Sequence, residues 1–202
     1  MANGNASTAQ ATQQPPKHIN LVRFLATCLL ALIVLVGLAV LITWLIIRPK
    51  RFVYTMENGS IQNFNLTNNH LNATFDFVLK AYNPNSRISL YYDYMESAVT
   101  YEDQTLAFNT VEPFFQPHRN ATRVESKLTA QNLALSPSIF KDIKVEKASG
   151  EIQVDVHFKS KIRFKVGVWK SRHRILRIVC SSVTVHFSWY KHFDKVPCEV
   201  EL

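Results

Sequence analysis

The chain has 202 residues, of which 19% are charged and only 5 are glycine, so as a whole it is neither collagen-like nor strongly disordered. A chain of this length holds one domain of ordinary size beside a membrane segment, and such a domain can bury a core without a metal ion. The formal net charge of +8 favours an anionic partner, which means lipid headgroups, acidic polysaccharide or nucleic acid.

The first part of the chain predicts a tail and a membrane anchor. Residues 1–16 are polar and end in two prolines, and we expect a disordered cytosolic tail over residues 1–23. Residues 24–47 carry no charge, and at 1.5 Å per residue a helix here would measure about 36 Å, enough to cross a bilayer core. The run has neither a polar face nor a small-residue cleavage site, so we expect an uncleaved signal anchor. Membrane anchorage makes nucleic acid the least expected partner.

Orientation is predicted from sequons and cysteines. Basic residues flank the apolar run on both sides, so the positive-inside rule does not decide. Cys180 and Cys198 are the only cysteines after residue 47, and one disulfide between them would indicate an oxidising compartment; two buried free thiols are the alternative. We expect a cytosolic N-terminus and an extracytoplasmic glycoprotein domain. The candidate N-glycosylation sites are Asn58, Asn65, Asn72 and Asn120.

A two-residue period dominates the rest of the chain. Residues 48–70 are expected to hold a linker and a first strand, and residues 71–202 the main domain. Alternating apolar residues predict a strand over 71–81, and shorter signals follow near 99–101, 106–108 and, more weakly, 124–128.

The C-terminal half continues this pattern. Ser136-Pro137 is typical of a helix start. Strict alternation over 152–168 predicts a strand so long that we expect a bend or bulge in it. Further strands are expected over 183–189, after Ser181-Ser182, and over 196–202. Together these elements predict a mainly β fold, an antiparallel β-sandwich of about seven strands with one short helix.

Catalytic chemistry has no signal in this sequence. No nucleophile elbow, zinc-protease, P-loop or dinucleotide motif is present. His186 and His192 lie near the two cysteines, but their spacing matches no compact metal-ligand pattern. We therefore expect no catalytic residue, no cofactor and no metal ion.

A basic stretch is the feature with functional content. No acidic residue occurs between Asp155 and Asp194, and four cations share one strand face. Such a face attracts anionic lipid or acidic cell-wall polysaccharide; a solvated face that prevents edge aggregation is the alternative. The candidates are Lys159, Lys161, Arg163, Lys165, Arg172 and Arg174, and Lys170, Arg177 and Lys191 lie in the same stretch.

Three sequence blocks resemble the plant harpin-induced-like family, whose members are also called non-race-specific disease-resistance-like proteins. The first block is Asn83-Pro84-Asn85-Ser86-Arg87-Ile88-Ser89-Leu90-Tyr91-Tyr92-Asp93, the second is Pro113-Phe114-Phe115-Gln116, and the third is Lys165-Val166-Gly167-Val168-Trp169-Lys170-Ser171. Pro117 stands where many relatives have glycine. Within the first block we expect Asn83 and Asn85 to shape a turn, Arg87 to pair with Asp93, and Tyr91 and Tyr92 to face opposite sides.

The resemblance implies a late embryogenesis abundant domain of the second subgroup, with a β-sandwich fold. It also implies a plant plasma-membrane protein, often found at plasmodesmata, that responds to pathogens and abiotic stress. We therefore expect a non-catalytic binding or signalling module at the outer face of the membrane. The alternative is a membrane-anchored lipid-binding or lipid-transfer module with a cavity between its sheets.

Overall fold

The computed structural model describes residues 17–47, 50–187 and 192–202, which form two compact units, 1–48 and 49–202. The first unit is the helix α1 (Lys17–Ile47), which begins at Lys17 rather than at the predicted Phe24. Its segment Leu21–Ile42 is long and apolar enough to cross a membrane. The large apolar side chains of this segment are exposed. The helix is therefore compatible with a membrane span or a signal sequence.

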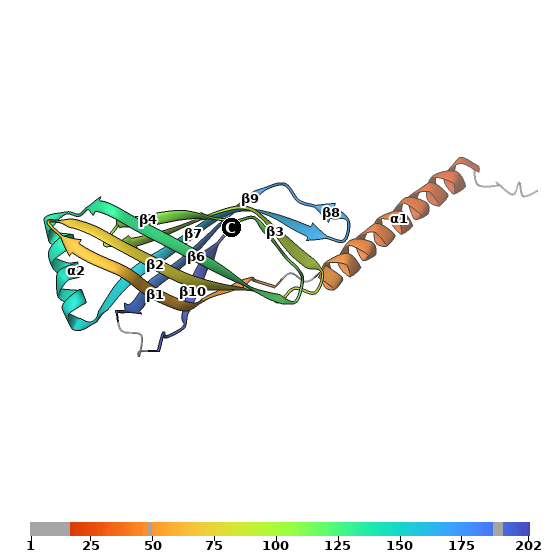
Figure 1. Cartoon of the computed structure of the whole chain (residues 1–202). Helices are drawn as coiled ribbons and strands as arrows, with labels where there is room; N and C mark the ends of the chain where they lie inside the picture. Colours follow the sequence, from red (N-terminus) through yellow and green to blue (C-terminus); the bar gives the residue numbers. More distant parts are fainter. Residues whose placement is uncertain (1–16, 48–49, 188–191) are drawn as a thin grey trace, which may run out of the picture. The chain divides into compact units, whose positions relative to one another are not determined.

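The second unit is mainly β (Figure 1). All of its strand pairs are antiparallel, in the order β4-β3-β7-β9-β10-β1-β2-β6, with β5 paired to β3 and β8 to β7. The elements are β1 (Val53–Thr67), β2 (His70–Asn83), β3 (Ile88–Tyr101), β4 (Gln104–Val111), β5 (Phe114–Gln116), β6 (Asn120–Ala134), α2 (Pro137–Ser149), β7 (Glu151–Val166), β8 (Trp169–Lys170), β9 (Arg174–His186) and β10 (Val196–Glu201).

One continuous sheet of ten strands replaces the predicted sandwich of about seven. The difference comes from β10, whose first three residues pair with β1 and whose next three pair with β9. The two edge strands, β4 and β6, are then bridged by side chains. Asn109 Nδ2 donates to Lys127 O at 2.7 Å, and Gln104 Nε2 donates to Ala134 O at 2.9 Å. The sheet is thus nearly closed into a barrel, which protects its edges from pairing with other chains.

The predicted strand regions within residues 71–168 are confirmed as β2, β3, β4, β6 and β7, except that β7 ends at Val166, two residues before its predicted end. The bulge expected within β7 was wrong: the register between β7 and β9 shifts between Val154 and Val156, and the extra residue there belongs to β9. The prediction for β9 was wrong at its start, because this strand begins at Arg174 and runs through Ser181-Ser182. Ser182 has a left-handed φ of +57°, and its N–H donates to Asp155 Oδ1 at 2.7 Å. The last residue of the predicted strand, Trp189, lies outside the described residues.

The predicted helix start is confirmed in α2. Ser136 is the N-cap, its hydroxyl accepts the Ile139 N–H at 3.3 Å, and Pro137 follows at the first helical position. Ile139 and Ile143 are buried against the sheet. The helix lies at one end of the strands, and β8 lies at the other (Figure 1).

Side chains fill the space enclosed by the nearly closed sheet, including the buried Tyr54, Phe75, Phe77 and Phe158. A polar network runs through this core: the hydroxyls of Tyr54 and Tyr92 lie 2.7 Å apart, and Tyr92 donates to Gln116 Oε1 at 3.0 Å. Burial raises the pKa of Tyr54 to about 12, so the phenol stays neutral. The network places Tyr92 of the first sequence block and Gln116 of the second in one structural core.

Candidate functional site

The Asn-Pro-Asn turn fixes the point where the chain joins the β-domain. Asn83 Nδ2 donates to the carbonyls of Ile88 at 2.8 Å and Pro117 at 3.0 Å, while Asn83 Oδ1 accepts the Asn85 N–H. Asn85 in turn binds the backbone of Lys50 twice, accepting its N–H at 2.7 Å and donating to its carbonyl at 2.9 Å. Both asparagines are buried. These motif residues therefore act as fold determinants.

The predicted pair of Arg87 with Asp93 was wrong. Asp93 binds Arg163 of β7 instead, accepting from both Nε, at 2.7 Å, and Nη2. The hydrogen bonds from Arg163 hold the pKa of Asp93 below its ordinary value. Arg87 lines a groove of about 610 Å³ with His118 and Lys165. Arg87 is nearer to Asp93 in the sequence, but the pairing of β3 with β7 places Arg163 next to Asp93 in space.

Five cations form what we call the outer basic face, on the solvent side of β7, β8 and β9. Two of its cross-strand pairs set like charges directly opposite each other, Lys159 with Arg177 and Lys165 with Lys170. Arg163 lies on the same face, but Asp93 compensates its charge. The face therefore consists of Lys159, Lys161, Lys165, Lys170 and Arg177, which are exposed or half-buried.

The other predicted basic residues lie elsewhere. Arg174 pairs with the buried Ile162, so strand alternation places it on the inner side of the sheet at its end. Arg172 lies in the connection between β8 and β9, and Lys191 lies outside the described residues. The sequence stretch was acid-free, but the fold distributes its cations over two sides of the sheet.

Aromatic rings support part of the outer basic face. Tyr91 and Phe115 lie with ring centroids 4.6 Å apart, and Lys170 Nζ lies 4.8 Å from the Tyr91 centroid. Lys165 Nζ lies 5.6 Å from the Phe115 centroid. Tyr91 is half-buried on this side while Tyr92 is buried in the core, which confirms that they face opposite ways. Phe115 was missed as a site residue, because the short strand β5 carries no periodic signal.

Three cations on the other half of the sheet share one carboxylate. Glu57 of β1 lies 3.2 Å from Lys80 Nζ and 2.7 Å from Arg123 Nε, and the hydrogen bond from Arg123, followed by that from Lys80, lowers its pKa. Lys195 Nζ lies 4.0 Å from the same carboxylate. The outer basic face also has an acidic neighbour, since the exposed Glu96 of β3 is paired with Lys159.

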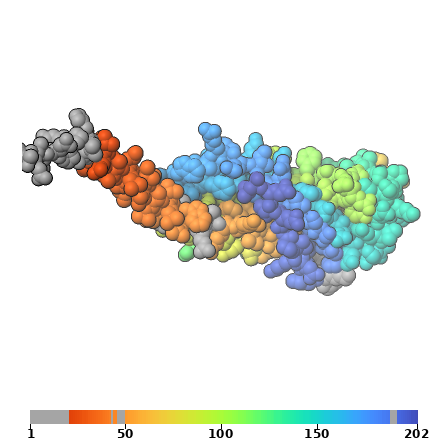
Figure 2. Space-filling view, turned by 180° about the vertical axis from the view of Figure 1, so that it is seen from behind, coloured from red at the N-terminus to blue at the C-terminus, as the bar shows by residue number. Residues whose placement is uncertain are grey.

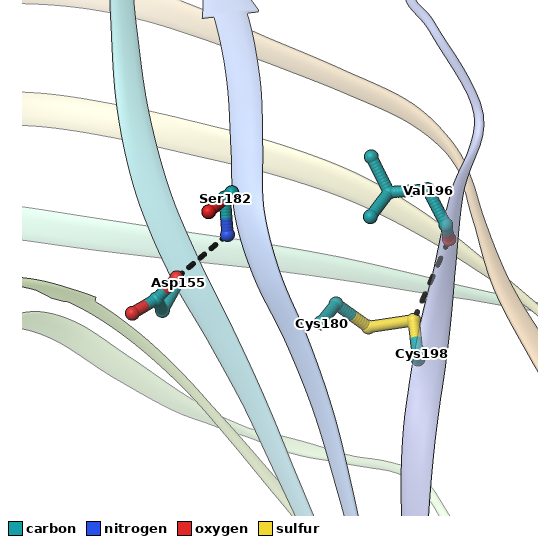
Figure 3. Close-up of a disulfide and its surroundings, with 5 residues drawn as sticks. All are labelled: Asp155, Cys180, Ser182, Val196 and Cys198. Carbon is teal, nitrogen blue, oxygen red and sulfur yellow. Dashed lines mark hydrogen bonds between the residues drawn. A yellow bond between two sulfur atoms is a disulfide. The ribbon is translucent and has the colours of Figure 1, made fainter.

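Cys180 of β9 and Cys198 of β10 form a disulfide (Figure 3). Cys180 is buried and Cys198 is half-buried. The bond joins β9 to the strand that connects the two halves of the sheet, and Figure 3 shows it beside the Asp155–Ser182 hydrogen bond. It also removes both cysteines from any metal site, and no metal-binding cluster of His, Cys, Asp or Glu occurs among the described residues.

The four sequon asparagines are all exposed: Asn58, Asn65, Asn72 and Asn120. Asn65 and Asn72 are paired across β1 and β2, so they present their side chains on one side of the sheet. Asn65 Oδ1 accepts the hydroxyl of Thr67 of its own sequon at 2.8 Å. Exposure makes each site sterically compatible with a glycan.

Comparison with known proteins now decides the family. The family model described as late embryogenesis abundant protein matches residues 78–180. The chain belongs to the late embryogenesis abundant protein family, among the NDR1/HIN1-like proteins. An uncharacterized protein of Arabidopsis thaliana is 37% identical over 93% of this chain and 87% of its own length.

Two named Arabidopsis thaliana relatives agree with that assignment. NDR1/HIN1-like protein 10 is 31% identical over 79% of this chain and 72% of its own. NDR1/HIN1-like protein 3 is 36% identical over 75% of this chain and 67% of its own. A crystal structure of a protein from Archaeoglobus fulgidus covers 62% of this chain and 96% of that protein, at 12% identity and a TM-score of 0.29, and this likeness carries no argument.

Proposed function

We propose that this protein is a single-pass plasma-membrane protein of plant defence and stress responses, found also at plasmodesmata. Its β-domain acts outside the cytoplasm as a non-catalytic binding module. Family membership supports the physiological role, and the apolar helix α1 supports the anchor. The disulfide and the four exposed sequons support an extracytoplasmic domain, because disulfides persist in oxidising compartments.

The topology is tested by protease protection and glycosidase digestion on intact membranes. We expect the β-domain to shrink on removal of N-glycans and to be cleaved only from the extracytoplasmic side. A variant with the four sequon asparagines replaced by Gln is the control, since it should no longer shift. An unglycosylated domain that is cleaved from the cytosolic side would reverse the proposed orientation.

The outer basic face is the binding surface in this proposal, and its like-charged cross-strand pairs carry the argument. Like charges directly opposite in a sheet destabilise it. Lys165 and Lys170 are opposite each other, while Lys159 is opposite Arg177 on one side and Glu96 on the other. An anionic partner would relieve this repulsion. Lipid headgroups and acidic wall polysaccharide both supply such charge outside a plant cell.

Charge reversal tests this surface. The isolated domain from Lys50 onward contains all the core residues, so it is suitable for solution binding. Lys159→Glu with Lys161→Glu should weaken binding to polygalacturonate or to phosphatidylserine vesicles at least about tenfold, since each cation near an anionic surface contributes roughly 1 kcal/mol. Binding of the wild type should also fall with added salt.

The matched control is Lys141→Glu with Lys144→Glu, which reverses two exposed lysines of α2 at the far end of the sheet. Equal loss in both variants would show that only net charge matters. Unchanged binding in the Lys159/Lys161 variant would refute the surface.

A second candidate function, lipid binding, is favoured by one pocket of about 600 Å³ at the end of the sheet where the chain joins the domain. Its apolar lining is completed by two cations, as an acyl chain with an anionic headgroup requires. The predicted site between the sheets is instead filled by core side chains. The pocket is lined by Lys50, Arg51, Phe52, Ile88, Phe164, Val200 and Leu202. Native mass spectrometry of the purified domain tests it, because a carrier should retain lipid and a pure binding module should not.

A further inference from the structure

The hairpin formed by β7 and β8 extends the sheet into a narrow projection. Gly167 and Val168 form its two-residue loop, and Gly167 has a φ of +58°, a conformation that suits glycine in such hairpins. Below the loop, Ser171 N–H donates to Phe164 O at 2.9 Å, and Phe164 N–H donates to Ser171 Oγ at 3.0 Å. The loop is therefore held at both sides of its base. In Figure 2 the light blue atoms of this part of the sequence lie on the surface of the domain.

The tip of this hairpin is apolar. The Val168 side chain is fully exposed, with a relative exposure of 101%, and the adjacent Trp169 is 61% exposed. Hairpin loops usually carry Gly, Asn or Asp, which adopt the turn conformation readily and expose little apolar surface to water. Single exposed apolar residues are common, but a Val–Trp pair at the end of a projection concentrates apolar surface at one point.

Cations flank the tip on one side. Lys165 and Lys170 are paired across the hairpin and lie over the rings of Tyr91 and Phe115, while Val166 and Trp169 form the next pair and point to the opposite side. Arg172 follows in an exposed position. Tryptophan and aliphatic side chains next to lysine and arginine are typical of segments that lie in the membrane interface.

The hairpin lies at the end of the domain where the chain from α1 arrives. Val166 is paired with Ile88, and Ile88 and Phe164 line one pocket with Lys50. Asn85 holds Lys50 in place through its two backbone hydrogen bonds. Lys50 follows Ile47 by three residues, so covalent geometry alone keeps their Cα atoms within about 11 Å of each other. If α1 spans a bilayer, this end of the domain is tethered close to its headgroups.

We infer that the β7–β8 hairpin is a membrane-docking tip. Val168 and Trp169 enter the interfacial layer of the bilayer that α1 spans, and Lys165, Lys170 and Arg172 contact lipid phosphates. This inference rests on the membrane anchorage proposed above. It adds a second attachment, which holds the domain in a defined orientation on the bilayer surface and leaves Lys159 and Lys161, further along β7, available to a soluble or wall-bound partner.

The test places a fluorophore at the tip of the full chain. In a Cys28→Ser background, Val168→Cys is labelled with an environment-sensitive dye and reconstituted into phosphatidylcholine vesicles containing phosphatidylserine. Val145→Cys is the matched control, because Val145 is also an exposed valine, at 62%, but lies on α2. We expect blue-shifted emission and quenching by spin-labelled lipids at position 168, at least about threefold stronger than at position 145.

Two further readouts make the outcome decisive. Trp169→Ser in the Val168→Cys chain should reduce the quenching, since it removes the larger half of the apolar tip. Flotation of the same sample reports anchorage through α1. Vesicles that carry the chain, with equal quenching at positions 168 and 145, would overturn the docking tip and leave anchorage intact. A chain that does not float would overturn the anchorage and the docking tip together.

Discussion

Reducing the Cys180–Cys198 disulfide should destabilise the β-domain by about 3 kcal/mol. The two cysteines are separated by 18 residues. In the chain-entropy description, closing a loop of that length in the unfolded state removes roughly 11 cal/mol/K, which corresponds to about 3 kcal/mol at 25 °C. Domains of this size have unfolding free energies of about 5–15 kcal/mol, so the disulfide is a substantial part of the total.

The assay is urea unfolding of the isolated domain from Lys50 onward, followed by intrinsic fluorescence with and without a reducing agent. Reduction breaks the S–S bond but leaves both sulfur atoms in place. It therefore avoids the cavity that alanine at the buried Cys180 would create. We expect a lower midpoint with a similar dependence on urea. Hydrogen exchange should show the largest loss of protection in β10, which has only three paired residues on each side. A difference below about 1 kcal/mol would refute the entropic reasoning.

Three other substitutions have defined outcomes. Gly59→Ala should cost about 1–3 kcal/mol in urea unfolding by overpacking, because a Cβ there would lie 2.8 Å from a ring carbon of Phe193 and 3.0 Å from one of Phe77; unchanged stability would contradict that crowding. Asn85→Ala should lower the unfolding free energy by about 1–3 kcal/mol, because it removes two part-buried hydrogen bonds to the Lys50 backbone, each contributing about 0.5–1.5 kcal/mol; a neutral result would mean that water replaces the amide. Asp93→Asn should lower the thermal midpoint at pH 7, and this difference from the wild type should vanish in acid. The pKa of Asp93 lies below its ordinary 3.8, so its ion pair with Arg163 stabilises the fold above pH 3.8 and is lost as the pH falls through the lowered pKa. A difference that does not depend on pH would argue against the ion pair.

Local patterns predicted the elements well. The alternation in β7 predicted its core face, including the buried Ile152 and Phe158, but its length wrongly suggested a bulge within it, since the extra residue opposite Asp155 belongs to β9. The Ser136-Pro137 pair gave the start of α2. Each of these signals depends on neighbours within a few residues, which is the range over which strand alternation and helix capping act.

Long-range pairing was not predictable in the same way. The sandwich prediction missed that β10 pairs with strands on both of its sides, because Cys198 pointed only to Cys180 of β9 and nothing in the six residues specifies β1. Asp93 pairs with Arg163 rather than with the nearer Arg87 since β3 and β7 are neighbours in the sheet. The start of β9 was missed because Ser182 takes a left-handed conformation, which shifts the alternation between its two halves.

The position of β10 has a consequence for biogenesis. Tyr54 at the start of the domain pairs with Cys198 near the end of the sequence, so one edge of β1 stays unpaired until β10 has been synthesised. Until β10 emerges, the ladders of β1 and β9 that it fills are open, and Cys180 has no partner within the domain. Folding of this sheet therefore completes after translation of nearly the whole domain. An early pause or truncation before Val196 should leave a species in which these edges of β1 and β9 stay open.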